Sequence, residues 1–461
     1  MAGVRILGSS KVRPRYDDSP PPTSSTRLSF FDTYWIPVQP VKTVLLYPDA
    51  AFFPASFDSF KSSLSLILPK FHPLVGDLTY QPATGEVTIV CSDESGVIVT
   101  EAESDLDIRC LAGEPTHDMD SFLKLVPNVA HEELPVPILS VQFTRFSSGG
   151  VTVGISIHHV AMDATGQWKF INCWAKTCCN GAVPSERRRR KKKKKKNYKQ
   201  SKLFTKLHTS QYFFPFLPFF PSSHTHPNAP NETLIDAPNL PKIDPYPSPD
   251  HKQLIQRSFT VDATTIQLLK QRAMQEKEAT HNLSPPTTFE VLGAHIWISI
   301  ARAMGITSEN NKPIFLFSFV DGRPFLPPPM SPAYTGNCLF PFHVASSGTH
   351  LMATDGLGRT CERIAETVNT TKDIIKRGSK VNLGFLDGMK VVLVGTNRLE
   401  VYGADFGWGK PSLMLHAAMN HDGEVVIFAG KEKGTVQLTV KLNNEAMEKF
   451  VHLFQGFKSH L

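Results

Sequence analysis

The chain has 461 residues, of which 41% are hydrophobic and 20% are charged. This length allows two or three domains and excludes a peptide hormone or a small disulfide scaffold, and the composition excludes disorder over most of the chain. The net charge of +7 depends on one run of ten basic residues, 187–196. Without it, 39 basic residues face 42 acidic ones and the remainder carries −3. The basic character is therefore local.

Membrane and disulfide classes are also disfavoured. The first forty residues contain no apolar signal segment, and no stretch approaches the roughly 20 apolar residues of a membrane-spanning helix. Seven cysteines form no C-x-x-C pair, and their odd number argues against a complete disulfide framework. We expect a cytoplasmic protein with no membrane partner and with buried free thiols.

The first half of the chain alternates between predicted helices and strands. Apolar residues at three- and four-residue spacing predict a helix within 54–69, and β-branched residues predict two strands of a hairpin within 86–100. Alternating residues predict a strand over 151–157. After a tight turn, helical spacing predicts a helix around 168–178.

The middle of the chain, 185–250, differs from both flanks. It holds the basic run, the aromatic and proline-rich stretch 213–221, and ten prolines between positions 215 and 250. This proline density excludes a helix or a central strand and is typical of a linker. We therefore divide the chain into an N-terminal domain, 1–184, a linker or low-complexity insertion, 185–250, and a C-terminal domain, 251–461.

The linker has a second explanation. Residues 186–196 can all be encoded by purine-only codons, and residues 213–223 by pyrimidine-only codons. A purine-rich tract followed by a polypyrimidine tract resembles a translated intron. Our hypothesis is that roughly 185–227 is a gene-model artefact or a retained intron, which peptide mass spectrometry tests. If the segment is real, we expect a disordered surface loop.

The second half again mixes helices and strands, which predicts an α/β or α+β fold with two domains of similar size. Its predicted helices are 261–276, 288–304 and 445–457, and its predicted strands are 314–320, 424–428 and 436–442.

The first candidate catalytic feature follows the strand 151–157. His159 begins the motif H-V-A-M-D, which ends in Asp163. A histidine at such a turn can present one ring nitrogen to a cleft, and its reference pKa of about 6.5 suits a general base. Asp163 either orients His159 or fixes the turn as a helix cap or ion-pair partner. Alone, the motif is weak, because a hydrogen-bonded histidine at a strand end is the ordinary alternative.

A second feature lies 246 residues after His159, where Asp405 begins D-F-G-W-G-K. Two glycines flanking Trp408 indicate a tight turn that fixes the indole and its N–H donor. The turn either supplies an oxyanion donor or is structural. The two motifs, in this order and spacing, resemble those of the plant acyl-CoA-dependent BAHD acyltransferases.

Three further segments carry the same resemblance. They are F-H-P-L-V-G-D-L at 71–78, D-G-R at 321–323 and Y-T-G-N-C at 334–338. The likeness covers most of the chain outside roughly 185–230. Ala164 stands where the family usually has glycine, and Thr335 where it has phenylalanine. Neither departure removes a group that reacts.

The resemblance implies two chloramphenicol-acetyltransferase-like domains, with mixed sheets flanked by helices and a channel at the domain interface. His159 would take the proton from a hydroxyl whose oxygen attacks the thioester of an acyl-CoA co-substrate directly. The resemblance thus implies an acyltransferase of class EC 2.3.1 with no permanently bound cofactor and no metal. The sequence agrees, since it has no G-x-S-x-G, P-loop or H-E-x-x-H motif.

The predicted site residues fall into two groups. The catalytic candidates are His159, Asp163 and Asp405, and the candidates for an oxyanion or structural role are Trp408, Gly407 and Arg323. For Asp163 we prefer a structural ion pair with Arg323 in bidentate geometry, which would lock the turn that presents His159.

The substrate is predicted from the resemblance. Y-x-G-N-C together with V-Y-G-A-D-F-G-W-G-K at 401–410 looks most like the branch that acylates sugars of anthocyanins, flavonoids and other phenolic glucosides. Malonyl-specific members tend to carry a basic residue shortly after the motif aspartate, where this chain has A-T-G-Q at 164–167. This favours an aromatic or neutral donor such as coumaroyl-CoA or caffeoyl-CoA, with malonyl-CoA as the alternative. We expect a monomer.

Two other classes remain as alternatives. The basic run near several phenylalanines suggests a nuclear or nucleic-acid-binding protein, which the local nature of the charge weakens. A carrier-protein condensation domain shares H-H-x-x-x-D but lacks D-F-G-W-G. Our prediction therefore includes no nucleic-acid partner.

Overall fold

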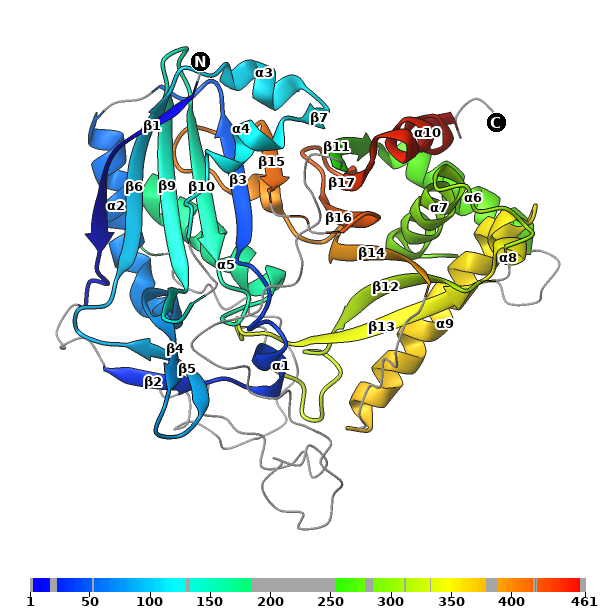
Figure 1. Cartoon of the computed structure of the whole chain (residues 1–461), viewed down its shortest axis with the longest axis horizontal. Helices are drawn as coiled ribbons and strands as arrows, with labels where there is room; N and C mark the ends of the chain where they lie inside the picture. The colour runs from blue at the N-terminus through cyan, green and yellow to red at the C-terminus, as the bar shows by residue number, and fades with distance from the viewer. Residues whose placement is uncertain are drawn as a thin grey trace, which may run out of the picture.

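The structure is a computed structural model that describes residues 3–16, 23–51, 54–129, 133–181, 183, 254–277, 285–310, 312–331, 333–378, 388–417, 419 and 421–456. The predicted linker, 185–250, lies outside these residues, and so does the segment of the intron hypothesis, roughly 185–227. The molecule contains mixed sheets flanked by helices, as predicted (Figure 1).

The first large sheet organises the half that carries His159. In spatial order it consists of β1 (Val4–Val12), β6 (Val97–Ser104), β9 (Leu139–Phe146), β10 (Val151–Ile157), β3 (Val41–Tyr47) and β15 (Leu413–His416). Only β6 and β9 pair in parallel. β10 is central, and all seven of its residues are buried.

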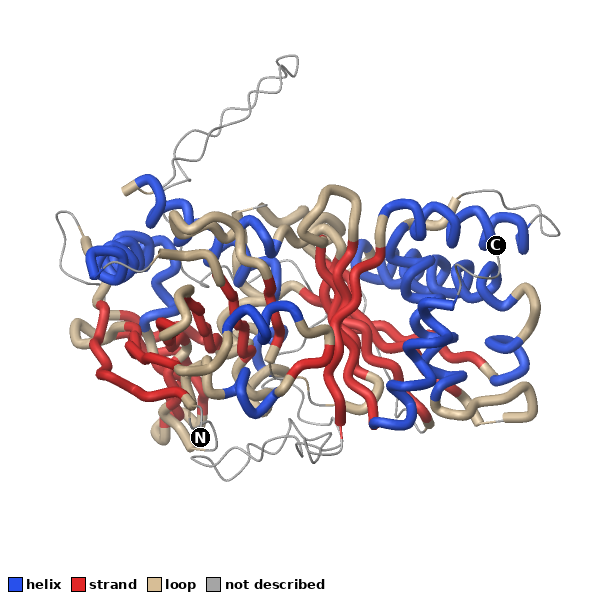
Figure 2. Tube along the Cα trace, turned by 90° about the horizontal axis from the view of Figure 1, so that it is seen from above, coloured by secondary structure: helices blue, strands red, loops and turns tan. Residues whose placement is uncertain are grey.

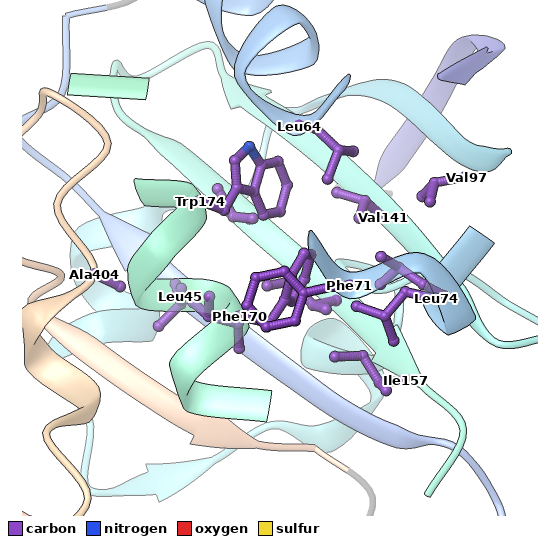
Figure 3. Packing of buried hydrophobic residues seen from close by; sticks show 14 of the residues in the cluster. Leu45, Leu64, Phe71, Leu74, Val97, Val141, Ile157, Phe170, Trp174 and Ala404 are labelled. Atoms are coloured by element: carbon purple, nitrogen blue, oxygen red, sulfur yellow. The ribbon is translucent and has the colours of Figure 1, made fainter. Parts of the chain in front are cut away.

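Helices cover both faces of this sheet. α2 (Pro54–Ile67) and α5 (Ala164–Asn180) pack on one face, where Figure 3 shows Leu64, Phe170 and Trp174 in the buried cluster with Leu45 and Val141. The short helices α3 (Ile108–Gly113) and α4 (Met119–Leu123) cover the other face.

The second large sheet organises the other half. Its spatial order is β13 (Leu339–Ser346), β12 (Ile314–Asp321), β14 (Met389–Thr396), β16 (Glu424–Ala429), β17 (Val436–Asn443), β11 (Leu254–Val261) and β7 (Thr116–His117). Helices cover the face turned away from the first half (Figure 2). They are α6 (Ala263–Lys277), α7 (Thr288–Ala303), α8 (Gly348–Met352), α9 (Gly356–Lys376) and α10 (Asn444–Gln455).

The remaining elements are short. A small sheet contains β2 (Ser24–Arg27), β5 (Glu86–Cys91), β4 (Asp77–Gln81) and β8 (Val136–Pro137). The other short elements are α1 (Phe30–Thr33) and two 3-10 helices: η1 (Leu68–Val75) contacts β5, and η3 (Val401–Gly403) contacts α5, β15 and β16.

Each half lends a strand to the other. β15 comes from the C-terminal part of the chain and pairs with β3, whereas β7 comes from the N-terminal part and pairs with β11. Side chains of the second sheet also bind carbonyl groups of β15: Gln437 Nε2 donates to the oxygen of Met414 at 3.0 Å, and Gln256 Nε2 to that of His416 at 2.7 Å. These bonds satisfy polar groups that burial would otherwise leave unpaired.

Most predicted elements are present, with one error of pairing. The strands predicted as a hairpin within 86–100 are β5 and β6, but β5 pairs with β2 and β4 while β6 pairs with β1 and β9. Their β-branched pattern identifies strands but does not specify partners.

The prediction of buried thiols is wrong for Cys110 and Cys179, which are exposed. No helix in the described ranges is long and apolar enough to cross a bilayer.

Candidate active site

His159 lies just beyond the end of β10, where the two halves meet. The backbone N–H of His158 still follows the sheet and donates to Ile138 at 2.8 Å. Asn337, from the second half, donates through Nδ2 to the His159 carbonyl oxygen at 2.9 Å. The Trp35 indole stacks on the imidazole with ring centroids 3.6 Å apart and planes at 18°. The ring is thereby held by Trp35 of the first half, and its backbone by Asn337 of the second half.

The surroundings of His159 keep its imidazole neutral. Burial lowers its pKa to about 4, because a charged ring would lose its hydration. At pH 7 the ring therefore carries no charge and has a nitrogen lone pair available. A neutral imidazole held in a fixed plane can act as a general base toward a hydroxyl group.

Asp163 fixes the turn that presents His159. Its carboxylate, which is fully buried, caps α5 by accepting from Gly166 N at 3.1 Å. The other oxygen accepts from Cys338 N at 3.1 Å and from Arg323 Nη2 at 2.8 Å. The predicted ion pair is present, but the predicted bidentate geometry is wrong, because a single guanidinium nitrogen contacts Asp163.

The remaining contacts of Arg323 explain that geometry. Its Nη1 donates to Asp321 at 3.0 Å, and Nη2 also donates to the Gly336 carbonyl at 2.5 Å. The guanidinium, 5% exposed, thus joins the turn after β10, the end of β12 and the loop before β13. These contacts assign Arg323 to the framework of the site, although its Nε N–H has no hydrogen-bond partner among the described residues.

The D-F-G-W-G turn is closed by its own aspartate. Asp405 Oδ1 accepts from Gly407 N at 2.8 Å and from Gly409 N at 2.9 Å. Both glycines have positive φ, +102° and +84°, which disfavours any other residue. The Gly407 N–H is therefore already engaged, and this geometry favours a structural role for Asp405.

Trp408 belongs to the aromatic core of the first half. It contacts the rings of Tyr47, Phe60 and Phe143, with centroids 5.4, 6.3 and 5.7 Å away. The motif thus anchors the segment that leads into β15. The structure does not bring Trp408 or Asp405 into contact with His159, and their role in catalysis stays a prediction.

Sequence reasoning missed three residues of the site as functional groups. Trp35 and Asn337 both contact His159, and His416 lies close enough that its charge would lower the pKa of His159. Asn337 could have been found from the sequence, because it lies in the Y-T-G-N-C segment that carries the family resemblance. No pattern in the sequence points to Trp35 or His416, because one sequence does not show that Trp35 stacks on His159 or that the strand of His416 joins the first sheet.

A cavity of about 580 Å³ opens near the D-F-G-W-G turn. Three lysines line it: Lys410 follows the turn, and Lys431 and Lys433 lie in the connection between β16 and β17. The start of α6, Tyr402 and two acidic residues, Glu400 and Glu432, also line it. Three lysines against two glutamates leave a small excess of positive charge, which favours an anionic ligand. Within the described residues, no group of three or more histidine, cysteine or acidic side chains could hold a metal ion.

Comparison with known proteins agrees with this geometry. Residues 4–456 match the model of the Transferase family. The chain belongs to this family, that of the BAHD acyltransferases. It is 26% identical to phenolic glucoside malonyltransferase 2 of Arabidopsis thaliana over 450 residues, covering 93% of each chain. It is 28% identical to a malonyl-coenzyme:anthocyanin 5-O-glucoside malonyltransferase of Salvia splendens over 466 residues, covering 95% and 93%.

Solved BAHD-like structures share the fold. Vinorine synthase superposes with a TM-score of 0.67 at 16% identity, covering 98% of both chains. TRI101 of F. sporotrichioides, complexed with coenzyme A and T-2, gives 0.64 at 19% identity, covering 94% and 98%. The predicted fold is confirmed. The epimerization domain from the third module of tyrocidine synthetase B gives 0.51 at 9% identity, so that domain has a similar fold.

Family membership confirms that this BAHD protein is an acyl-CoA-dependent acyltransferase of the EC 2.3.1 type. Among the relatives, agmatine coumaroyltransferase of Arabidopsis thaliana is 25% identical over 450 residues, with 93% of each chain covered. Relatives named for malonyl and for coumaroyl transfer are thus similarly distant from this BAHD chain.

Proposed function

We propose that this enzyme transfers an acyl group from a CoA thioester to a sugar hydroxyl of an anthocyanin, a flavonoid or another phenolic glucoside. The observation that supports it most is the neutral imidazole of His159, fixed between the halves by Trp35 and Asn337. The hydroxyl proton passes to His159 as its oxygen bonds to the thioester carbonyl carbon. The carbon–sulfur bond then breaks, and the proton passes to the departing thiolate sulfur.

The CoA moiety fits the cavity lined by Lys410, Lys431 and Lys433. Its phosphates are anionic, and lysine ammonium groups are suited to binding them as point charges. The cavity adjoins the D-F-G-W-G turn, whose neighbouring residues Tyr402 and Gly403 line it. We propose that the donor binds here and extends its thioester toward His159.

An aromatic wall beside His159 supports a phenolic substrate. Trp35 contacts Phe319 with centroids 5.7 Å apart, and Phe319 contacts Phe317 at 5.1 Å. Both phenylalanines are half-buried and alternate along β12 with the buried Leu316. Their face of the strand is therefore opposite to the helix-covered core, and it offers ring surfaces on which a planar group can pack.

We propose an aromatic or neutral acyl donor, such as coumaroyl-CoA or caffeoyl-CoA. The first turn of α5 carries no basic side chain, and its polar groups bind locally: Gln167 Nε2 donates to Met162 O at 3.2 Å. A malonyl carboxylate would find no cation in this turn, and Lys169, in the next turn, donates through Nζ to the Tyr334 carbonyl oxygen at 3.2 Å. Malonyl-CoA remains the second candidate because two of the relatives compared above are named for malonyl transfer. We further propose that the enzyme acts as a cytoplasmic monomer.

A substrate panel tests this proposal. Malonyl-, acetyl-, coumaroyl- and caffeoyl-CoA are each offered with an anthocyanin glucoside, a flavonoid glucoside and a simple phenolic glucoside. We expect acylation of the sugar, with the highest kcat/KM for an aromatic donor. A Lys431→Ala/Lys433→Ala variant should raise the donor KM and leave the acceptor KM unchanged. A strong preference for malonyl-CoA contradicts the donor assignment, and acceptance of no glucoside contradicts the acceptor assignment.

A further inference from the structure

A second histidine, His416, ends β15 on the same side of the first sheet as His159. β15 and β10 both pair antiparallel with β3, so they run in the same direction and finish at the same end of the sheet. His416 lies opposite Thr43, which lies opposite Ile155. Directly paired residues point to one face, so the His416 side chain shares the face of Ile155 and Ile157. His159 follows directly from that strand.

The two imidazoles are close enough to influence each other. Protonated His416 would disfavour a charge on His159 and lowers its pKa. Burial lowers the pKa of His416 to about 4, and the charge of Lys441 adds to this. Both rings are therefore neutral at pH 7. A neutral imidazole has one N–H donor and one acceptor nitrogen for a ligand.

The backbone of His416 is fixed while its ring is free. Gln256 Nε2 donates to its carbonyl oxygen at 2.7 Å, and Ala417 N donates to the Lys42 carbonyl at 2.7 Å. Among the described residues, the half-buried ring makes no hydrogen bond. The ring nitrogens are not fully buried, so a rigidly held imidazole without a protein partner is available to hydrogen-bond a ligand.

The position of His416 favours the acceptor over the CoA phosphates. Val436 begins β17 at the lysine-lined cavity, whereas Lys441, whose charge acts on His416, lies five residues further along the strand. Five residues of strand span about 17 Å. His416 therefore lies well away from the proposed phosphate site and near the base that deprotonates the acceptor.

We propose that His416 hydrogen-bonds a sugar hydroxyl adjacent to the one that is acylated, and thereby determines the position of acylation. This inference rests on the proposed function. A hexose offers several hydroxyls of similar reactivity, so His159 alone does not select among them. A second imidazole that binds a neighbouring hydroxyl fixes the orientation of the sugar, and a sugar lacking that hydroxyl loses this hydrogen bond.

Kinetics and product analysis of His416 variants test the inference. His416→Leu and His416→Phe should raise the acceptor KM about tenfold, the value of one lost hydrogen bond. The donor KM should stay within about twofold, and NMR should show products acylated at more than one hydroxyl. His416→Gln, which keeps a donor, should recover most of the affinity and selectivity. His452→Gln, an exposed histidine on α10, is the matched control and should behave as wild type.

The outcomes separate this inference from the proposed function. Unchanged acceptor KM and a single unchanged product in both apolar variants overturn the role of His416. If wild type acylates no glucoside but accepts another hydroxyl compound, the acceptor class is wrong. In that case, His416→Leu and His416→Phe should show the same rise in KM for that compound relative to wild type. An unchanged KM in both variants overturns the role of His416 as well.

Discussion

Asp163 is fully buried, and both of its carboxylate oxygens accept hydrogen bonds from the protein. Its oxygens are occupied by Arg323, Cys338 N and Gly166 N, so it holds together segments that lie far apart in the sequence. The ion pair with Arg323 could be predicted from charge and motif. Its single-nitrogen geometry could not, because that depends on Asp321 and Gly336 competing for the same guanidinium.

Asp163→Asn should therefore act through stability. The substitution leaves the Arg323 charge buried and without its full partner, which costs about 3–5 kcal/mol. We expect a lower melting temperature, and a loss of activity that follows the loss of folded protein. Calorimetry and kinetics on the same preparation check this. A variant that melts like wild type but is as inactive as His159→Ala would show that Asp163 acts in the chemistry.

The lowered pKa of His159 makes a prediction about pH. The base acts only when neutral, so kcat/KM should fall on the acid side with a midpoint near pH 4, below the usual histidine value, and should be flat around pH 7. Trp35→Ala exposes the ring to water and should move this midpoint upward toward about 6.5. Tyr34→Ala, at an exposed neighbour, should leave it unchanged. An acid limb near 6.5 in wild type would contradict the desolvated base.

At the scale of elements, the strand–turn–helix unit that presents His159 was predictable, and its docking was not. The strand 151–157 and the helix after it follow from periodicity, with Asp163 and Gly181 as their cap signals. The contact between the start of α5 and the loop before β13 has no local signal. The pairing error at β5 and β6 has the same origin, because both strands find partners far away in the sequence.

Gly166 tests that docking. A Cβ at this position would lie 2.0 Å from the Thr335 carbonyl oxygen, so α5 would have to move away from the loop that carries Asn337. We expect Gly166→Ala to lower the melting temperature and to reduce kcat, although alanine favours helices. Gly113→Ala, at a helical glycine with open space around its Cβ, is the control and should be neutral. Equal behaviour of the two variants would contradict tight docking at α5.

The whole molecule is organised by the exchange of strands between its halves. β15 brings His416 into the first sheet, and the loop before β13 brings Asn337 to His159, so neither half alone holds the complete site. Two domains of similar size could be predicted from the alternation of elements. The exchange could not, since β7 and β15 have only two and four residues and no distinctive pattern. The domain limits 1–184 and 251–461 stay a prediction.

The basic run gives a prediction at this scale. Its ten charges lie outside the described residues, whereas the site and the lysine-lined cavity are built from described residues between 35 and 436. Deletion of 186–196 should therefore leave kcat and KM for acyl transfer within about twofold, because every residue to which we assign a role in the site lies outside the run. Steady-state kinetics of the deletion variant check this. Loss of acyl transfer on deletion would link the run to catalysis and revive a role for its charge.

His159 as the general base is the central claim, and its most direct test is kcat for His159→Ala against wild type. The comparison uses the best donor and glucoside of the panel, with CoA binding and circular dichroism as controls of folding. We predict that kcat falls by about 10²–10⁴-fold, the contribution of a positioned base, while CoA still binds. A folded His159→Ala enzyme that retains wild-type kcat would contradict the account.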